Sequence, residues 1–214
     1  MKLLKYYILA VISIVTLSGA VVSDVYAQMH DHLNADVTRD GNGNLYVVWL
    51  ELDEGTTTNG NVYMQKYNAA GVKQWTDAIQ VNVNSLNWVQ GWEPTPRIDN
   101  HATWLYITWA RGFQELVMQR FDLQGNRIWA TDMQVNATEP AETLGYEIEA
   151  DSIGFVYVHF QRHGPSGRSS FMQKIDPNGQ PMWQTLTNIF DIRSGQGGSE
   201  ARQTMAISSD DAIY

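Results

Sequence analysis

Short apolar runs alternate with clusters of Gly, Asn and Asp along most of this chain. Three of these runs mix β-branched and aromatic residues over five positions, at 45–49, 105–109 and 156–160. Such runs are typical of β-strands, and no long segment after residue 27 has the apolar spacing of an amphipathic helix. The pattern therefore predicts an all-β protein.

Each run forms part of a group of four predicted strands. A first strand precedes it, near residues 35–38, 96–98 and 147–150, with a further one near 203–207. The third strand carries a Met-Gln-Lys/Arg triplet. The fourth follows a Trp and includes residues 79–82, 133–136 and 187–190. Asp-, Asn- and Gly-rich turns separate the strands, as expected for antiparallel hairpins.

The groups are copies of one repeat. Their triplets begin at residues 64, 118 and 172, which are 54 residues apart. The residues that keep this spacing are Gln65, Gln119 and Gln173, then Gly71, Gly125 and Gly179, and finally Trp75, Trp129 and Trp183. Four antiparallel strands at such a period indicate the stacked blades of a β-propeller.

The repeated Trp residues are interpreted as structural. A buried aromatic of this size removes about 150–250 Å² from water, so each indole is expected to lie between neighbouring blades. Replacing one of them with Ala should cost about 3–5 kcal/mol.

Residues 1–27 have the features of a secretory signal. Lys2 and Lys5 precede an uncharged, mostly apolar stretch at 6–22, and small residues stand before a cleavage point after Ala27. We expect an exported protein that is secreted, held at the cell surface or periplasmic. The alternative is an uncleaved anchor, although the stretch is shorter than the ~20 residues that span a bilayer.

Residues 28–34 form a lead-in, and residues 35–214 are expected to be a partial β-propeller. Its blades lie near 35–94, 95–145 and 146–200, and a fourth begins near 201–214. Propellers close with about four to eight blades. We therefore expect about three and a half blades here, with further blades or domains following Tyr214 in the natural gene.

Composition and charge limit the kinds of partner that the protein is expected to bind. The chain has 14 Lys and Arg against 23 Asp and Glu, a net charge of −9, which argues against nucleic acid because phosphate binding needs clustered cations. It has no Cys, so it has neither disulfides nor a lipid-modified cysteine. No basic amphipathic helix is present for a membrane surface, and we expect no membrane insertion after signal cleavage and no cofactor.

A binding site is expected at the end of the sheets where loop length varies. From the second-strand Tyr to the repeated Gln is 19, 13 and 16 residues in the three copies, and variable loops on a fixed scaffold are often recruited for binding. Drift at permissive loops would give the same variation.

Two segments on that side carry candidate residues. The first segment contains Trp88, Trp92 and Glu93, which lie outside the repeat register. The two indoles could stack on a sugar or anchor a partner protein. Alternatively, they could pack between neighbouring blades. The candidates of the second segment are Arg162, His163 and Arg168 in a Gly-rich loop that suits an anion. No motif of a known hydrolase, metalloprotease or phosphate loop is found, so no catalytic or metal-binding residue is assigned.

The unit Gln-Lys/Arg-φ-Asp-x-x-Gly-x-x-x-Trp, where φ is apolar, resembles repeats of secreted bacterial β-propeller proteins over nearly all of residues 35–214. It is more distantly similar to quinoprotein-type and sialidase-type propellers, whose Gly and Trp spacings differ. The resemblance implies a fold and an extracellular location. We expect a non-catalytic module that binds glycan or protein. The alternative is a polysaccharide-active hydrolase or lyase with part of its site in further blades.

Overall fold

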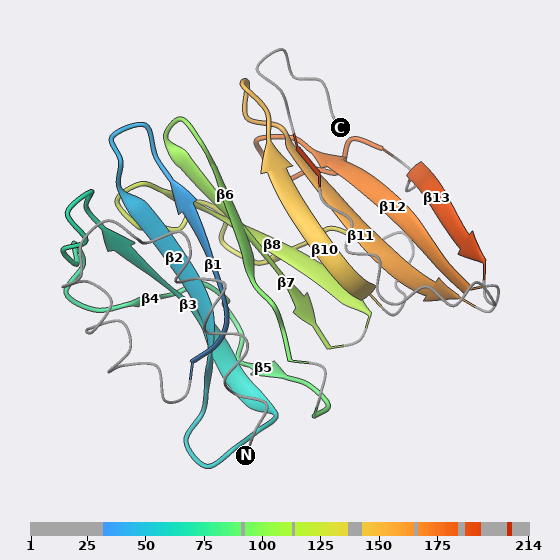
Figure 1. The fold of residues 1–214 in the computed structure, drawn as a ribbon, viewed down its shortest axis with the longest axis horizontal. Helices are drawn as coiled ribbons and strands as arrows, with labels where there is room; N and C mark the ends of the chain where they lie inside the picture. The colour runs from blue at the N-terminus through green and yellow to red at the C-terminus, as the bar shows by residue number, and fades with distance from the viewer. Residues whose placement is uncertain are drawn as a thin grey trace. The chain divides into compact units, whose positions relative to one another are not determined.

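The computed structural model contains three antiparallel β-sheets (Figure 1). It describes residues 32–90, 93–112, 114–136, 143–164, 167–183, 187–193 and 205–206. Every regular element in these ranges is a β-strand, which confirms the all-β prediction.

The first sheet has the strand order β1-β2-β3-β4. Its strands are β1 (His32–Arg39), β2 (Leu45–Leu52), β3 (Asn59–Tyr67) and β4 (Ile79–Gln80). A short fifth strand, β5 (Leu86–Asn87), also pairs with the start of β3. This strand was not predicted from the sequence, which indicates only a link between sheets at this point.

The second and third sheets repeat the same up-and-down order. The second contains β6 (Arg97–His101), β7 (Trp104–Arg111), β8 (Glu115–Asp122) and β9 (Met133–Gln134). The third contains β10 (Thr143–Ala150), β11 (Val156–Gly164), β12 (Gly167–Ile175) and β13 (Thr187–Arg193). In both of these sheets consecutive strands pair, so each of the two is a simple meander.

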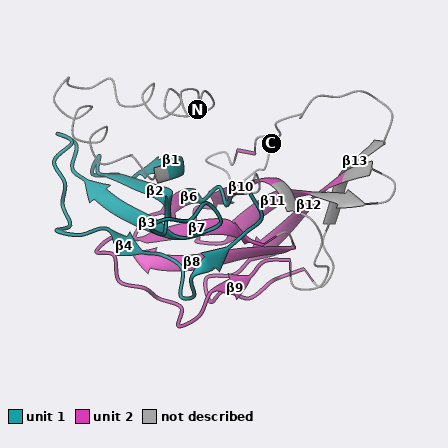
Figure 2. Ribbon diagram, turned by 90° about the horizontal axis from the view of Figure 1, so that it is seen from below, with its two compact units in different colours: residues 1–98 teal, residues 99–214 magenta. Residues whose placement is uncertain are grey.

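The chain divides into two compact units, residues 1–98 and 99–214 (Figure 2). The first unit contains the whole first sheet, and the second contains the third sheet and nearly all of the second.

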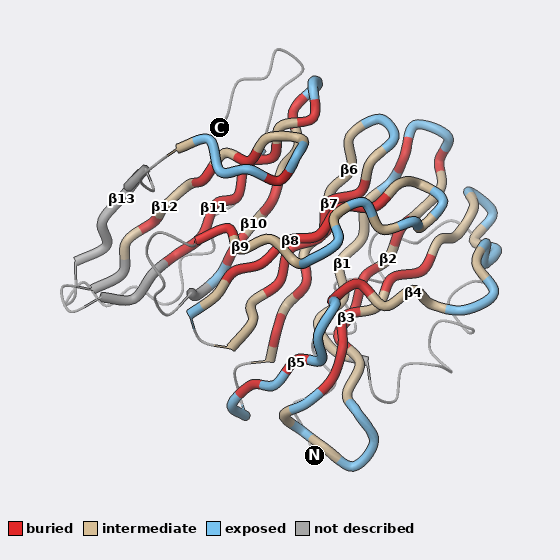
Figure 3. The backbone as a smooth tube through the Cα atoms, turned by 180° about the vertical axis from the view of Figure 1, so that it is seen from behind, coloured by how far each residue is buried: buried red, intermediate tan, exposed pale blue. Residues whose placement is uncertain are grey.

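Each sheet has two faces, named here by repeated residues. The Tyr face carries Tyr46, Tyr106 or Tyr157, and the Gln face carries Gln65, Gln119 or Gln173, because successive residues of a strand point to opposite sides. Burial is concentrated in the middle of the strands, while the turns are exposed (Figure 3).

The second unit has a core between two sheets. The Tyr face of the second sheet meets the Gln face of the third, so that Tyr106, Leu116 and Met118 pack with Val156, Val158, Phe160 and others. Polar contacts cross the same junction. The Tyr106 hydroxyl donates to the Gly154 carbonyl at 3.1 Å, and the Arg120 guanidinium donates to the Pro177 carbonyl.

The repeated Gln residues have closely similar settings in the first and third copies. Gln65 is buried, accepts hydrogen bonds from the backbone N–H groups of Lys66 and Trp75, and donates to the Trp75 carbonyl at 3.2 Å. Gln173 makes the matching bonds to Lys174 and Trp183. The side chain of each Gln therefore ties the Trp segment to the third strand.

The repeated Gly and Trp residues are explained by backbone geometry and packing. Gly71, Gly125 and Gly179 have φ of 77°, 90° and 84°, a region that favours Gly. A Cβ added to Gly179 would stand 3.0 Å from the Trp129 ring, so the Trp of one sheet lies on the Gly of the next within the second unit.

Two predictions were imprecise in extent. The fourth strands of the first two sheets are only two residues long, where four were expected. Met205 and Ala206, the described part of the strand expected near 203–207, lie outside any strand. The predicted signal at 1–27, most of the lead-in, and the remainder of the fourth repeat lie outside the described residues.

Candidate functional site

The two ends of the sheets differ in how their connections are built. At one end, called here the turn end, Asp side chains close the turns. The Asp40 carboxylate accepts from the N–H groups of Asn42 and Asn44, both at 2.9 Å, and Asp151 accepts in the same way from Ile153 and Phe155. The equivalent turns at 68–72, 122–126 and 176–180 use Asn68, Asp122 and Asp176.

The Asp carboxylates of these turns are hydrogen-bonded within the turns themselves. Burial alone would raise the pKa of Asp40, but hydrogen bonds from Asn44, Tyr46 and Asn42 together lower it. The pKa of Asp122 is lowered for the same reasons. Since backbone N–H groups and neighbouring side chains already occupy both carboxylate oxygens of Asp40 and Asp122, these turns offer little for a ligand.

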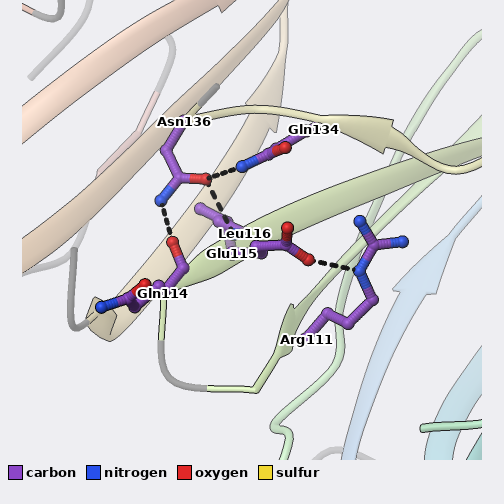
Figure 4. A network of polar contacts seen from close by, with 6 residues as sticks. All are labelled: Arg111, Gln114, Glu115, Leu116, Gln134 and Asn136. Carbon is purple, nitrogen blue, oxygen red and sulfur yellow. Dashed lines mark hydrogen bonds and ion pairs between the residues drawn. The ribbon is translucent and has the colours of Figure 1, made fainter. Parts of the chain in front are cut away.

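The opposite end, called here the loop end, carries the connections between second and third strands. Asn136 is fully buried there, beside the start of β8 and the loop that joins it to β7 (Figure 4). Its side-chain oxygen accepts from the Leu116 N–H at 3.0 Å, and its side-chain nitrogen donates to the Gln114 carbonyl at 2.7 Å. The side-chain amide of Asn136 thus makes the hydrogen bonds to the start of β8 that a neighbouring strand would otherwise make, because β9 has already ended.

Asn82 occupies the same place in the first sheet. Its oxygen accepts from the Val62 N–H at 2.8 Å, and its nitrogen donates to the Asn84 carbonyl at 2.7 Å. The repeated Gln-Val-Asn sequences at 80–82 and 134–136 are the signal that could have identified this role. They were interpreted only as strand residues.

An ion pair marks the loop end of the second sheet. The Arg111 Nε lies 2.6 Å from the Glu115 carboxylate, with the two side chains 33% and 39% exposed. Figure 4 shows the pair beside the Asn136 network. The arrangement presents a cation, an anion and the side-chain amides of Gln114 and Gln134 within one short region. Such groups can hydrogen-bond to the hydroxyls of a polar ligand.

The aromatic candidates are only partly described. Trp88 is 7% exposed, and its backbone N–H donates to the Thr58 carbonyl at 2.9 Å. Among described atoms its indole nitrogen has no hydrogen-bond partner. So little exposed ring favours packing over stacking on a sugar. Glu93 is half-buried, and Trp92 lies outside the described residues.

The basic candidates lie on the hairpin of the third sheet. His163 and Arg168 are paired across β11 and β12, next to the Gly164–Gly167 pair at the tip. Arg162 pairs with Ser169 in the following position. The backbone therefore brings these three residues together at the loop end, and their side chains lie outside what is described.

Carboxylates also gather on the first strands of the second unit. Asp99 of β6 accepts from the Ala150 N–H of β10 at 2.8 Å, and Glu147 and Glu149 lie on one face of β10. Burial, followed by the charges of Asp99 and Glu147, raises the pKa of Glu149 to about 7. Sequence reasoning missed this cluster because Asp99 is remote from Glu149 along the chain.

The described residues include no group of three His, Asp or Glu side chains able to hold a metal ion. In the same ranges no helix has the length and apolar character needed to cross a membrane. A comparison of the sequence with known protein families and with curated proteins gives no match.

Proposed function

We propose that the chain is part of an exported β-propeller that binds glycan or protein at the loop end of its sheets, without catalysis. The observation that carries the proposal is the contrast between the two ends. One repeat produces three consecutive sheets, whose turns between the third and fourth strands are closed in the same way each time.

The loop end supplies different residues in each copy. The connection in the second sheet is short and bears the Arg111–Glu115 pair, whereas the third sheet places Arg162, His163 and Arg168 there. A rigid scaffold with unlike loops on one side is suited to recognition, because loop residues can change without disturbing the sheets.

A hydroxyl-rich ligand suits the second-sheet site. Arg111 and Glu115 are each about one-third exposed, so their remaining hydrogen-bonding capacity faces water. A solvent-accessible ion pair contributes little to the stability of a protein. Ligand binding therefore explains the presence of this charged pair beside the buried Asn136 better than stability does. Secretion or display at the cell surface follows from the predicted signal sequence.

The test is a glycan array probed with purified protein, followed by binding titrations on the ligands found. Arg111→Ala at the loop end is expected to abolish binding, and so is Trp92→Ala at the position that the sequence suggests for stacking, while Arg127→Ala at the turn end leaves it unchanged. Equal loss with Arg127→Ala would contradict the proposal. Release of a cleaved product that depends on a carboxylate would instead favour the polysaccharide-active enzyme.

A further inference from the structure

The loop ends of the first and second sheets can be compared position by position, because both belong to the same repeat. Glu51 pairs with Asn61 in the first sheet, and Arg111 pairs with Glu115 in the second. Asn61 and Glu115 each stand one residue before the N–H group that donates to the buried Asn after the fourth strand. The two sheets therefore have the same framework at this end, with different side chains on it.

The first sheet closes this framework on itself. The Asn61 side-chain oxygen accepts from Gln80 at 3.1 Å and from Asn82 at 2.9 Å. The Asn61 side-chain nitrogen donates to the Asp53 carboxylate at 3.3 Å. Both ends of the central amide are therefore paired within the sheet and its loop, as expected for a structural role.

The second sheet leaves the framework open. Glu115 stands in the place of Asn61, but it accepts from the Nε of Arg111 at 2.6 Å. Gln134 keeps only a long contact of 3.5 Å to Asn136. Within the described part of the chain, the second oxygen of the Glu115 carboxylate and the Gln134 side-chain oxygen have no hydrogen-bond partner.

Arg111 also replaces an acceptor. In the first sheet Glu51 accepts from the Trp49 indole N–H at 3.3 Å. Arg111 occupies the position of Glu51, and a guanidinium has no acceptor atom. The indole nitrogen of Trp109, the equivalent of Trp49, accordingly has no hydrogen-bond partner among the described residues. The exchange removes one hydrogen bond and adds an ion pair that contributes little to stability, so a ligand explains Arg111 better than folding does.

The guanidinium of Arg111 keeps one edge available. Its Nε is bonded to Glu115, and Figure 4 shows its two terminal nitrogens pointing away from that carboxylate. Neither terminal nitrogen is hydrogen-bonded to another described residue. Together they form the planar fork that matches the oxygens of a carboxylate or of a tetrahedral oxyanion. Glu115 holds this fork in position.

The loop end of the third sheet lies next to this fork, in the same compact unit. The Ala110 N–H, adjacent to Arg111 in β7, donates to the Tyr146 hydroxyl of β10 at 3.0 Å. Tyr146 pairs with Phe160 of β11, and Phe160 precedes Arg162 by two residues. The tip of the third-sheet hairpin therefore begins close to Arg111.

The described positions of that hairpin and of the strand beside it are rich in basic residues. Arg193 of β13 pairs with Gly167 at the tip, and Asp191 is the carboxylate two residues before it. The basic residues at these positions are Arg162, His163, Arg168 and Arg193. The Arg111–Glu115 pair is neutral as a whole, so cations outnumber carboxylates here in a chain whose net charge is −9. A local excess of positive charge attracts an anionic ligand.

We propose that the ligand of the loop end is a glycan that bears acid groups, and that Arg111 selects it by holding a carboxylate or sulfate on its terminal nitrogens. Hydroxyls of the same sugar donate to the unpaired oxygens of Glu115 and Gln134. An acidic peptide offers carboxylates without these hydroxyl donors. The inference rests on the proposed binding function and narrows its ligand.

The test compares polymers that differ only in charge, namely polygalacturonate with its methyl ester and dextran sulfate with dextran. Isothermal titration of the whole chain is expected to show tighter binding of the charged member of at least one pair, and that pair distinguishes carboxylate from sulfate. Arg111→Gln keeps N–H donors but removes the charged fork, and it should weaken this binding about 10- to 100-fold. Arg127→Gln at the turn end is the matched control and should bind like the unchanged protein.

The outcomes separate this inference from the proposed function. Equal binding of both members of each pair overturns the inference and leaves glycan binding intact. Poly-L-glutamate bound as tightly as the charged glycan overturns it in favour of an acidic protein partner. Full affinity in Arg111→Gln, with a circular dichroism spectrum that shows the fold retained, overturns it as well. Binding of no glycan at all overturns both.

Discussion

Gly179→Ala offers the sharpest probe of how the repeat holds its sheets together. The residue has a φ of 84°, and its missing Cβ would lie 3.0 and 3.1 Å from two carbons of the Trp129 ring. An Ala at this position must therefore tolerate a left-handed backbone and displace an indole that packs on the core of the second unit.

The two penalties can be separated. The left-handed conformation costs an L-residue roughly 1–2 kcal/mol, and overpacking typically adds about 1–3 kcal/mol. Ala also lowers the conformational entropy of the unfolded chain, which stabilises the folded protein by about 0.4–1 kcal/mol. Gly179→Ala should then destabilise by about 2–4 kcal/mol.

Gly112→Ala is the matched control in the same unit. Its φ of 66° is also left-handed, but a Cβ there would meet nothing within 4 Å. It should show only the backbone cost, about 1 kcal/mol after the entropy gain. Both values are measured by urea unfolding followed by far-UV circular dichroism.

A double-mutant cycle assigns the excess to the contact. In a Trp129→Ala background the Cβ at residue 179 no longer meets a ring, so the coupling free energy between the two sites should be about 1–3 kcal/mol. Equal costs for Gly179→Ala and Gly112→Ala, or a coupling near zero, would refute the idea that the Gly is repeated to accommodate the neighbouring Trp.

Three further predictions concern the second unit. The pKa of Glu149 in the folded protein is about 7, above its ordinary value of 4.5. The stability that Glu149 contributes is therefore present below pH 4.5 and is lost as the pH rises through 7. Glu149→Gln should flatten the fall in the urea midpoint between pH 5 and 8, and an unchanged slope would exclude Glu149 as the cause of that fall. Asn136→Ala should cost about 1–3 kcal/mol because it leaves the buried Leu116 N–H unpaired, whereas Gln134→Ala, which loses only a 3.5 Å contact, should be nearly neutral by the same unfolding assay. Phe160→Ala, at a site with no exposed surface, should cost about 3–5 kcal/mol, against a negligible change for Ile153→Ala, which is 68% exposed.

Much of the fold could be predicted from local sequence. The apolar runs at 45–49, 105–109 and 156–160 all lie within second strands, and the Met-Gln-Lys/Arg triplets lie in third strands. Strand alternation and turn chemistry act over a few residues, and a repeated pattern shows them three times. The fourth strands were overestimated because Asn82 and Asn136 look like strand residues, yet their side chains end the pairing.

The candidate site was harder to predict. Trp88 stands outside the repeat, and the sequence left open whether its ring stacks on a ligand or packs between blades; the ring is only 7% exposed. Arg111 and Glu115 attract no notice in the sequence, since their pairing depends on a tight connection between β7 and β8. Whether an indole or an ion pair reaches solvent depends on neighbours that the local pattern does not specify.

The sequence by itself determined the class of structure, the order of the strands and the two faces of each sheet, because these follow from residue alternation and from a 54-residue repeat. Only the tertiary structure decided which equivalent faces are covered, so that Val158 is buried while Val47 remains partly open. It also decided the pKa of Glu149, which burial and then the charge of Asp99 raise. Burial and charge at one residue depend on atoms brought close from distant parts of the chain, and a repeat that is nearly the same in every copy cannot distinguish its own surroundings.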